Sequence, residues 1–355
     1  MKDRIIELLE EVLHPETQLG LVSSGFVENL VVEEGKISIT LRFAKVRDPF
    51  SVKIKNQVTA LLESNFPALA GSIVVMVKEG AAPKPKPKEA PTATTAIANI
   101  VAISSAKGGV GKSTVTANIA TTLRDMGFRV GILDADIYGP SQHKMFGCEQ
   151  HTPEAISEKG FDYIIPAQVQ GLKLISIGFF VSPSDALMWR GVMASNALKQ
   201  LIHQTKWGVL DFLLIDLPPG TGDIHLSLLT ELKVTSAVIV STPQQVALAD
   251  VLRGVEMFRH EQVNIPIAGI IENMAWFTPA ELPNNRYYIF GKGGAEKMAA
   301  EVGIPHLGSI PIVQSIMECS DAGEPAAALH EDVKEYYKTV TEKMIANTLN
   351  KNGEV

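Results

Sequence analysis

The sequence predicts an α/β protein in which a doubly wound, mostly parallel sheet is preceded by a small α+β domain. From residue 97 onward, short runs of β-branched and aliphatic residues alternate with stretches of helical periodicity, which is typical of βαβ units around a buried parallel sheet. A segment of alternating proline and lysine separates this region from about 80 residues of a different pattern. We therefore expect a domain at 1–80, a linker at 81–96 and a second domain at 97–350.

The first domain has the pattern helix, strand, strand, helix, strand. Ile5, Leu8, Leu9 and Val12 recur at helical spacing in the opening segment. The remaining elements are expected as two strands that form a hairpin around Glu33–Lys36, a helix and a short apolar strand, at Val27–Val32, Ile37–Phe43, Val52–Leu62 and Ile73–Val77.

The linker predicts an extended polyproline-type spacer, because alternating proline removes backbone donors and fixes φ. Its Lys84, Lys86 and Lys88 leave a second interpretation open, a basic strip that docks a partner.

In the second domain, six apolar runs are predicted to be strands: Ile100–Ser104, Val130–Leu133, Leu210–Ile215, Ala237–Ser241, Ile267–Ile271 and Leu307–Ile310. A final helix, Val333–Leu349, carries mixed charges. A helix on a lipid surface is richer in lysine and arginine, so we expect this one to pack on the core.

Composition excludes several classes of protein. The 355 residues are 46% hydrophobic and carry a net charge of −7, whereas a nucleic-acid binder needs clustered basic residues. No apolar run reaches the ~18–20 residues of a membrane span, and the amphipathic N-terminus does not have the pattern of a secretory signal. We expect a cytoplasmic protein with neither nucleic acid nor membrane as a partner.

A glycine-rich segment follows the first strand of the second domain and opens a helix. It reads Ser105-Ala-Lys-Gly-Gly-Val-Gly-Lys-Ser-Thr114, which has the context of a P-loop and its spacing, except that Ala106 stands where the ordinary motif has its first glycine. Backbone N–H groups of such a loop surround phosphate oxygens, the Lys112 ammonium reaches the β- and γ-phosphates, and the Ser113 hydroxyl joins the Mg²⁺ shell. The expected nucleotide contacts are Gly108, Gly109, Val110, Gly111, Lys112, Ser113 and Thr114.

Two acidic motifs complete the predicted site. Asp134 and Asp136 follow the strand Val130–Leu133, and Asp216 ends an apolar strand in a Walker B arrangement, where it is expected to hold Mg²⁺. For Asp134 a structural role in a turn is equally compatible with the pattern. Gly220, which follows Asp216-Leu-Pro-Pro, is placed to sense a γ-phosphate through its N–H.

The segment Lys107-Gly-Gly-Val-Gly-Lys-Ser-Thr114 resembles the deviant Walker A motif of the MinD/ParA/ArsA class of ATPases. The resemblance implies an ATP-dependent homodimer in which Lys107 acts on the nucleotide of the partner. It also implies that Asp136 positions the attacking water, so that Lys107, Lys112, Asp136 and Asp216 are the expected catalytic residues. By the same resemblance Asn273 binds adenine, and Pro311 with Ile312 flanks the base.

Within this class, four segments are similar to the Mrp/ApbC family: Asp134–Ser141, Asp216–Asp223, Glu272-Asn-Met274 and Ser309–Ile312. Residues 1–80 resemble the small iron–sulfur-assembly-associated domain that often precedes such an ATPase, although Arg47-Asp48-Pro49 stands where some members carry a cysteine. The resemblance implies a homodimeric carrier that delivers iron–sulfur clusters, such as a 4Fe–4S cluster, to apo-proteins.

One departure from this family concerns cysteine. The family's Cys-x-x-Cys is absent from the residues after Met274, and the chain has only Cys148 and Cys319, whereas a cluster needs about four thiolate-type ligands. Each cysteine is expected to be a small buried or partly exposed residue, and of the two Cys319 is the stronger candidate ligand because it lies near the expected nucleotide edge. His225 and His306 are weaker candidates, because a lone histidine is usually structural or on the surface. The aromatic residues that replace the motif either dock a partner or pack: Trp276, Phe277, Tyr287, Tyr288 and Phe290.

Three functions are therefore compared. The leading one is an ATP-hydrolysing iron–sulfur carrier. The alternative is a ParA/MinD-like positioning protein that switches on a membrane or DNA with ATP. The third, an electron-transfer ATPase of the nitrogenase iron-protein type, needs bridging cysteines of its own.

Overall fold

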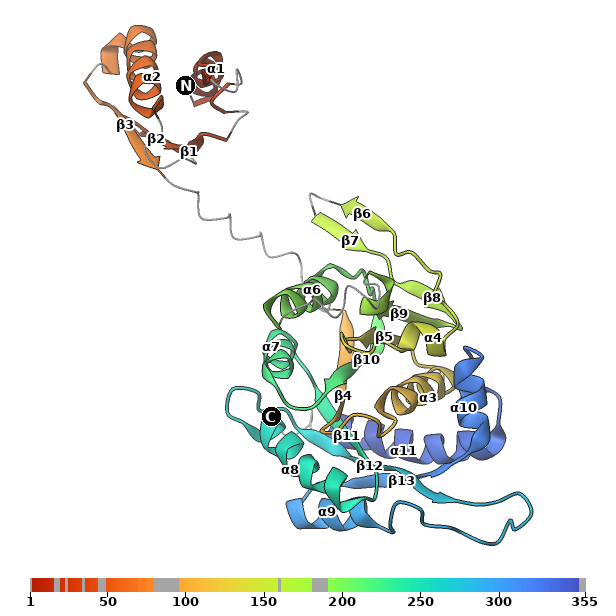
Figure 1. The fold of residues 1–355 in the computed structure, drawn as a ribbon. Helices are drawn as coiled ribbons and strands as arrows, with labels where there is room; N and C mark the ends of the chain where they lie inside the picture. The colour runs from red at the N-terminus through yellow and green to blue at the C-terminus, as the bar shows by residue number, and fades with distance from the viewer. Residues whose placement is uncertain are drawn as a thin grey trace. The chain divides into compact units, whose positions relative to one another are not determined.

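The computed structural model describes residues 2–15, 20–22, 25–33, 36–43, 49–69, 71–79, 96–158, 161–180 and 191–350. Contacts divide the chain into two compact units, Met1–Glu89 and Ala90–Val355 (Figure 1). The proposed linker 81–96 lies, except for Ala96, outside the described residues, as does Arg47-Asp48 of the first domain.

The first unit packs two helices on one face of a three-stranded sheet. Its elements are α1 (Lys2–Glu11), β1 (Val27–Glu33), β2 (Lys36–Phe43), α2 (Ser51–Asn65), the 3-10 turn η1 (Pro67–Leu69) and β3 (Ile73–Glu79). Strand β2 lies in the centre, antiparallel to β1 and parallel to β3. The register pairs Glu33 with Lys36, which confirms the expected hairpin. Ile5, Leu9 and Ile39 are among the fully buried residues of its core.

The second unit contains an eight-stranded sheet with the order β13-β12-β11-β4-β10-β5-β9-β8. Its strands are β4 (Ile97–Ser105), β5 (Val130–Asp134), β8 (Ala167–Val169), β9 (Leu172–Ser176), β10 (Leu210–Pro219), β11 (Ser236–Ser241), β12 (Ile267–Phe277) and β13 (His306–Ile312). Only β8 among them pairs antiparallel, so the sheet is mostly parallel as predicted. A separate hairpin is formed by β6 (Ala155–Glu158) and β7 (Phe161–Ile164).

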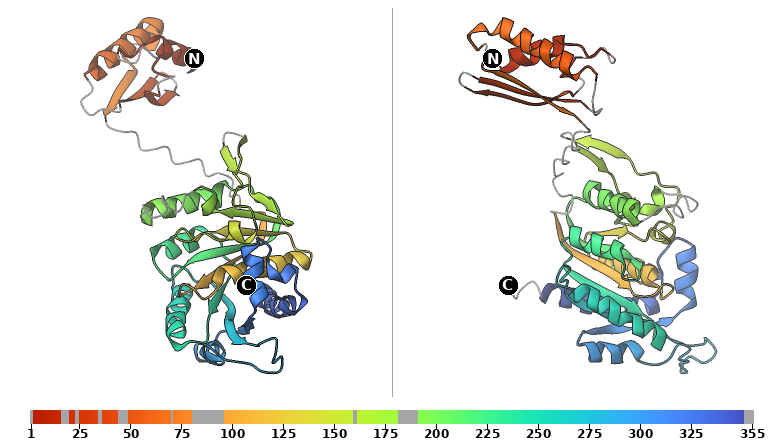
Figure 2. Two further views of the ribbon diagram at one scale, coloured as in Figure 1. Left: turned by 45° about the vertical axis from the view of Figure 1, so that its right-hand side comes forward. Right: turned by 60° about the vertical axis from the view of Figure 1, so that its left-hand side comes forward.

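Helices cover both faces of this sheet (Figure 2). One face carries α6 (Gly191–Gln204), α7 (Asp223–Glu231), α8 (Gln245–Arg259) and α9 (Gly294–Val302). The other carries α3 (Lys112–Asp125), α10 (Gln314–Asp321) and α11 (Glu331–Asn350), with the short helix α4 (Gln142–Met145) and the 3-10 turn η3 (Ala326–Ala328) nearby. The 3-10 turn η2 (Ile177–Phe179) directly follows β9. Each face buries its own apolar cluster, so the doubly wound prediction is confirmed.

The last helix packs on the core as predicted. Val333, Tyr337, Val340 and Met344 of α11 are buried against the cluster that also contains α3 and β13. No helix among the described residues is long and apolar enough to cross a membrane.

Candidate functional site

The site forms where three neighbouring strands, β4, β10 and β5, end at the same edge of the sheet. The P-loop leaves the end of β4, Asp216 lies near the end of β10, and Asp134 is the last residue of β5. The register pairs Asp216 with Ile103 on one side and with Asp134 on the other. Because parallel strands present their carboxyl ends together, this order gathers charged groups that are far apart in the chain.

The P-loop is held in shape by two left-handed glycines and one amide. Gly109 and Gly111 have φ angles of 81° and 82°, a region that favours glycine. The Asn273 side chain of β12 donates from Nδ2 to the Val110 carbonyl at 2.9 Å. A Cβ on Gly111 would lie 2.3 Å from that Nδ2, so the absence of a side chain lets the loop approach Asn273.

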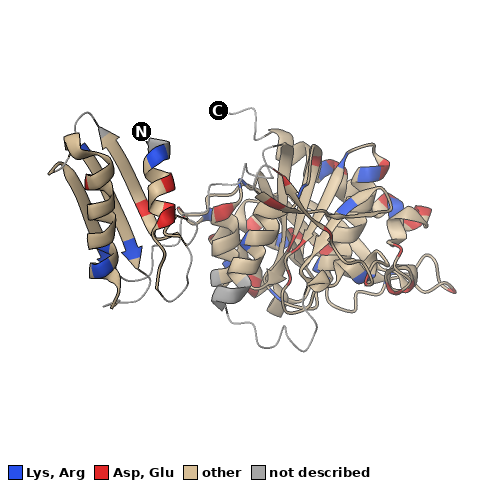
Figure 3. Ribbon diagram, turned by 90° about the horizontal axis from the view of Figure 1, so that it is seen from above, with Lys and Arg blue, Asp and Glu red and all other residues tan. Residues whose placement is uncertain are grey.

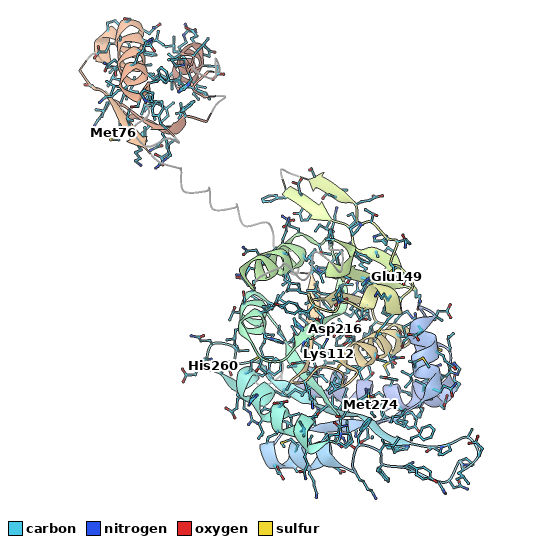
Figure 4. The ribbon with its side chains drawn as sticks, viewed as in Figure 1. Met76, Lys112, Glu149, Asp216, His260 and Met274 are labelled. Carbon is cyan, nitrogen blue, oxygen red and sulfur yellow. The ribbon has the colours of Figure 1, made fainter. Side chains whose placement is uncertain are left out.

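Lys112 is buried at the start of α3 and turns toward the acidic groups. Its Nζ contacts Asp216 Oδ1 and lies 3.7 Å from Asp136 Oδ2 and 3.4 Å from the Ser113 hydroxyl. Figure 4 shows Lys112 and Asp216 side by side at the centre of the unit. The structure thus brings together Lys112, Ser113, Asp136 and Asp216, as the sequence motifs predicted. The Lys112 ammonium here lies between two carboxylates. A bound phosphate can take the place of the carboxylates beside the ammonium, and a divalent cation can take the place of the ammonium beside the carboxylates.

Asp134 has a structural environment. Its carboxylate accepts hydrogen bonds from the backbone N–H groups of Asp136, Ser141 and Gln142 and from the Ser176 hydroxyl. Complete burial and the neighbouring Asp216 charge raise its pKa, while the hydrogen bonds from Ser176 and Gln142 oppose this. Of the two interpretations left open by the sequence, the contacts favour a residue that shapes the turn after β5.

Asp136 faces the P-loop lysine instead. Burial raises its pKa, and the positive charge of Lys112 counteracts that shift. Its Oδ1 accepts the backbone N–H of Gly139 at 3.2 Å, which orients the carboxylate within the same turn.

The short helix α4 adds residues that the motifs did not predict. Gln142 is completely buried and donates from Nε2 to Asp216 Oδ2 at 2.8 Å and to the Ser113 carbonyl at 2.9 Å. The next residue is His143, whose ring Nδ1 lies 3.2 Å from the Ser176 hydroxyl. Burial lowers the pKa of His143. The motif Asp134–Ser141 ends one residue before Gln142, so it pointed to this part of the chain without including either residue.

The loop after β10 is tied back to the P-loop strand. Gly220 donates its N–H to the Ser105 carbonyl at 2.9 Å, so in this conformation the predicted sensor group is engaged within the protein. His225 is buried and its Nε2 lies 2.8 Å from the Pro218 carbonyl, which gives it a role in holding this loop.

Beside the P-loop lies a cavity of about 490 Å³ that contains both predicted base-binding residues. Its walls include Thr114, Asn273 and Met274, together with the strand end at Pro311 and Ile312. Glu272 points elsewhere, because its carboxylate accepts the Ala295 N–H at 2.7 Å and so caps helix α9. The size and the mixed polar and apolar walls of the cavity suit a nucleoside.

The aromatic segment after β12 packs partly on the protein and is partly exposed. Trp276 contacts Tyr336 of α11 edge to face and carries the Arg286 guanidinium over its ring at 4.4 Å. Phe277 and Tyr287 exchange two backbone hydrogen bonds of 2.8 Å, whereas the side chains of Tyr287, Tyr288 and Ile289 are exposed. The packing interpretation therefore holds for Trp276, while docking of a partner by the exposed side chains stays a prediction.

The two cysteines lie beside the apolar cluster around α3 and are not disulfide-bonded. Burial raises the pKa of Cys319 and raises that of Cys148 to about 11, which disfavours the thiolate that a metal needs. In the described part of the chain, no group of three or more His, Cys, Asp or Glu residues forms a metal site. His306 instead lies 3.5 Å from the Ser309 hydroxyl.

The residues around Lys112 fit Mg²⁺. The Ser113 hydroxyl and the Asp216 and Asp136 carboxylates are hard oxygen donors, which Mg²⁺ prefers. Three protein ligands are too few for a complete coordination shell, which agrees with Mg²⁺ because this cation usually takes its remaining ligands from phosphates and water.

Comparison with known proteins agrees with the two units. Residues 96–347 match the family model described as the NUBPL iron-transfer P-loop NTPase, and residues 2–72 match the iron–sulfur cluster assembly protein model. An iron–sulfur cluster carrier protein of Synechocystis is 37% identical over 325 residues, covering 91% of this chain and 90% of its own length.

Two solved structures are also similar. A nucleotide-binding protein of Archaeoglobus fulgidus, in complex with ADP, is 36% identical with a TM-score of 0.60, covering 70% of this chain and 96% of its own. The Mg-ADP complex of the septum site-determining protein MinD of Pyrococcus horikoshii is 20% identical with a TM-score of 0.52, covering 72% and 99%, and shows the shared fold. The chain belongs to the NUBPL-type, iron–sulfur cluster carrier family of P-loop NTPases.

Proposed function

We propose that this chain is an ATP-hydrolysing, homodimeric carrier that delivers iron–sulfur clusters to apo-proteins. The observation that carries the nucleotide half is the buried Lys112–Asp216 pair, with Asp136 and Ser113 beside it and a nucleoside-sized cavity next to the loop. Family membership supports the cargo.

In this proposal Lys112 leaves the carboxylates and binds the β- and γ-phosphates of ATP. Ser113 and Asp216 hold Mg²⁺, which when bound neutralises phosphate charge. Asp136 orients the attacking water, and the loop N–H groups of residues 108–114 surround the phosphates. Asn273 and Pro311 contact the base from the cavity wall.

The environment of Lys107 is an argument for the proposed dimer. It is half-buried at the start of the loop and makes no ion pair with the described residues of its own chain, so its ammonium is available to a second copy. We propose that it reaches the nucleotide of the partner, as the resemblance to the MinD/ParA class implies.

The positioning-protein alternative is less well supported. Figure 3 shows Lys and Arg interspersed with Asp and Glu on the second unit, rather than gathered into one basic face that DNA or an anionic membrane would bind.

ATP turnover tests the site. Lys112→Met keeps the length of the side chain and removes its charge, so turnover is expected to fall to background, while the exposed-lysine control Lys338→Met keeps the wild-type rate. Turnover that persists in Lys112→Met contradicts the site assignment.

Iron and sulfide content tests the cargo. Anaerobic reconstitution of the wild-type protein is expected to give cluster absorbance that transfers to an apo-acceptor, and Cys319→Ala is expected to lower the bound iron. Iron near zero per dimer, with ATP turnover intact, would refute the carrier role while leaving the ATPase assignment standing.

A further inference from the structure

Gln142 occupies an unusual place for a neutral side chain, because it is completely buried among the charged groups of the P-loop site. Its Nε2 bridges Asp216 Oδ2, at 2.8 Å, and the Ser113 carbonyl, at 2.9 Å. Both partners only accept hydrogen bonds, so the nitrogen end of the amide must face them and its orientation is fixed. Its own backbone N–H is held by Asp134 Oδ2 at 3.0 Å.

These contacts give the two carboxylate oxygens of Asp216 different partners. Oδ1 faces Lys112, and the Thr116 hydroxyl lies 3.4 Å away, while Oδ2 is held by Gln142. A carboxylate with one oxygen fixed in this way cannot rotate freely about its side-chain bond. The same amide also fixes the backbone of Ser113, the residue whose hydroxyl stands beside Lys112.

The other end of the Gln142 amide is still unsatisfied. Its Oε1 is buried and accepts no hydrogen bond from the described residues. A buried acceptor without a donor destabilises the folded protein, so such groups in native proteins have a reason for being kept. Because Oε1 and Nε2 share one carbon, this free acceptor also lies next to Asp216.

We propose that Gln142 is a positioning residue of the Mg²⁺–nucleotide site. It presents Asp216 Oδ1 and the Ser113 hydroxyl to the cation together, and its Oε1 accepts a hydrogen bond from a water in the cation's shell. Residues that orient metal ligands in this way typically contribute 10- to 100-fold to metal affinity or activity. The inference rests on the proposed nucleotide site and adds a residue that no motif in the sequence contains.

A purely structural role makes a different prediction. If Gln142 only fastens α4 to α3, its loss weakens ADP binding equally with and without Mg²⁺. If it positions the cation ligands, its loss removes the gain in ADP affinity that Mg²⁺ provides and leaves the metal-free affinity unchanged.

The experiment measures ADP binding by calorimetry to the full chain, in Mg²⁺ and in EDTA, for the wild type, Gln142→Leu and Gln142→Glu. The exposed Gln168→Leu is the control for a glutamine-to-leucine change. We expect Gln142→Leu to lose about 10- to 100-fold of the Mg²⁺-dependent gain, with its affinity in EDTA within about twofold of wild type. Gln168→Leu is expected to match wild type in both conditions.

Gln142→Glu keeps the shape of the side chain and gives a readout by pH. Ionised, its carboxylate repels Asp216 and cannot donate; protonated, it donates one hydrogen bond. Relative to wild type, its Mg²⁺-dependent gain is therefore expected to recover as the pH falls from 8 to 5.5. An unchanged Mg²⁺ gain in Gln142→Leu, or no pH-dependent recovery in Gln142→Glu if the leucine variant does not fold, overturns the inference. Wild-type protein that fails to bind ADP at all contradicts the proposed function instead.

Discussion

Replacing Gly111 by alanine tests the contact between the phosphate loop and Asn273 of strand β12. Gly111 has a φ of 82°, and a methyl group there would meet Asn273 Nδ2 at 2.3 Å. That amide donates to the Val110 carbonyl, so the substitution strains the backbone and also displaces the hydrogen bond that holds the loop.

The two effects have separate magnitudes. A non-glycine residue in the left-handed region costs about 1–2 kcal/mol. Loss of the Asn273–Val110 hydrogen bond costs a further ~0.5–1.5 kcal/mol. If both fall on the loop conformation that binds phosphate, the total of about 1.5–3.5 kcal/mol weakens ADP binding about 10- to 300-fold.

Calorimetric titration of ADP into Gly111→Ala measures the loss. Gly109→Ala is the matched control, since its φ is 81° but a Cβ there meets nothing within 4 Å. It is expected to show only the backbone part, about 5- to 30-fold. In Gly111→Ala/Asn273→Ala the clash is absent, so the two substitutions are expected to cost less together than the sum of their separate effects. Equal losses in Gly111→Ala and Gly109→Ala, with additive effects in the double variant, would refute the argument.

Three further predictions concern stability. The Tyr337 hydroxyl is buried without a hydrogen-bond partner among the described residues, so Tyr337→Phe is expected to leave the free energy of unfolding in urea unchanged or raise it by up to ~1 kcal/mol; a clear loss contradicts this. Asn118 is buried and accepts the Ala327 N–H at 2.8 Å, so Asn118→Ala is expected to lower that free energy by about 2 kcal/mol. Hydrogen bonds from Arg129 lower the pKa of Asp211 to about 2, so the stability they contribute is present above the usual carboxyl pKa and is lost as the pH falls from about 4 toward 2. Asp211→Asn is therefore expected to cost less than about 1 kcal/mol at pH 7, because Arg129 is exposed, and the gap to wild type should narrow below pH 4 in urea unfolding.

The sequence predicted those parts of the site that are formed by residues adjacent in the chain. The P-loop shape follows from its glycines, and the acids at the ends of β5 and β10 follow from apolar strands that stop at charged residues. Strand order then completes the arrangement, because β10 lies between β4 and β5 and brings Asp216 against Lys112. That strand order was not visible in the sequence.

The missed contacts come from elements that no local pattern connects. Gln142 reaches Asp216 across 74 positions of the chain, and Ser176 reaches Asp134 across 42. The hairpin of β6 and β7 escaped prediction because its short strands contain no buried residue and carry little apolar alternation. Strand β12 continues to Phe277, beyond the predicted end at Ile271, through a register shift against β13 and a left-handed Met274 with a φ of 55°. An apolar run cannot reveal such an extension.

The long segment between β12 and α9 is held near each end by hydrogen bonds. Glu272 holds the first turn of α9, and the paired backbones of Phe277 and Tyr287 close the intervening residues into a loop. Neither fastening uses a side chain of residues 278–286, and none of these residues lines the cavity beside the P-loop, so substitutions among them are expected to leave the nucleotide pocket unchanged. The composition of this loop and the phosphate chemistry of the P-loop site are therefore expected to be separable, so a metal-binding residue introduced there should leave ADP binding intact.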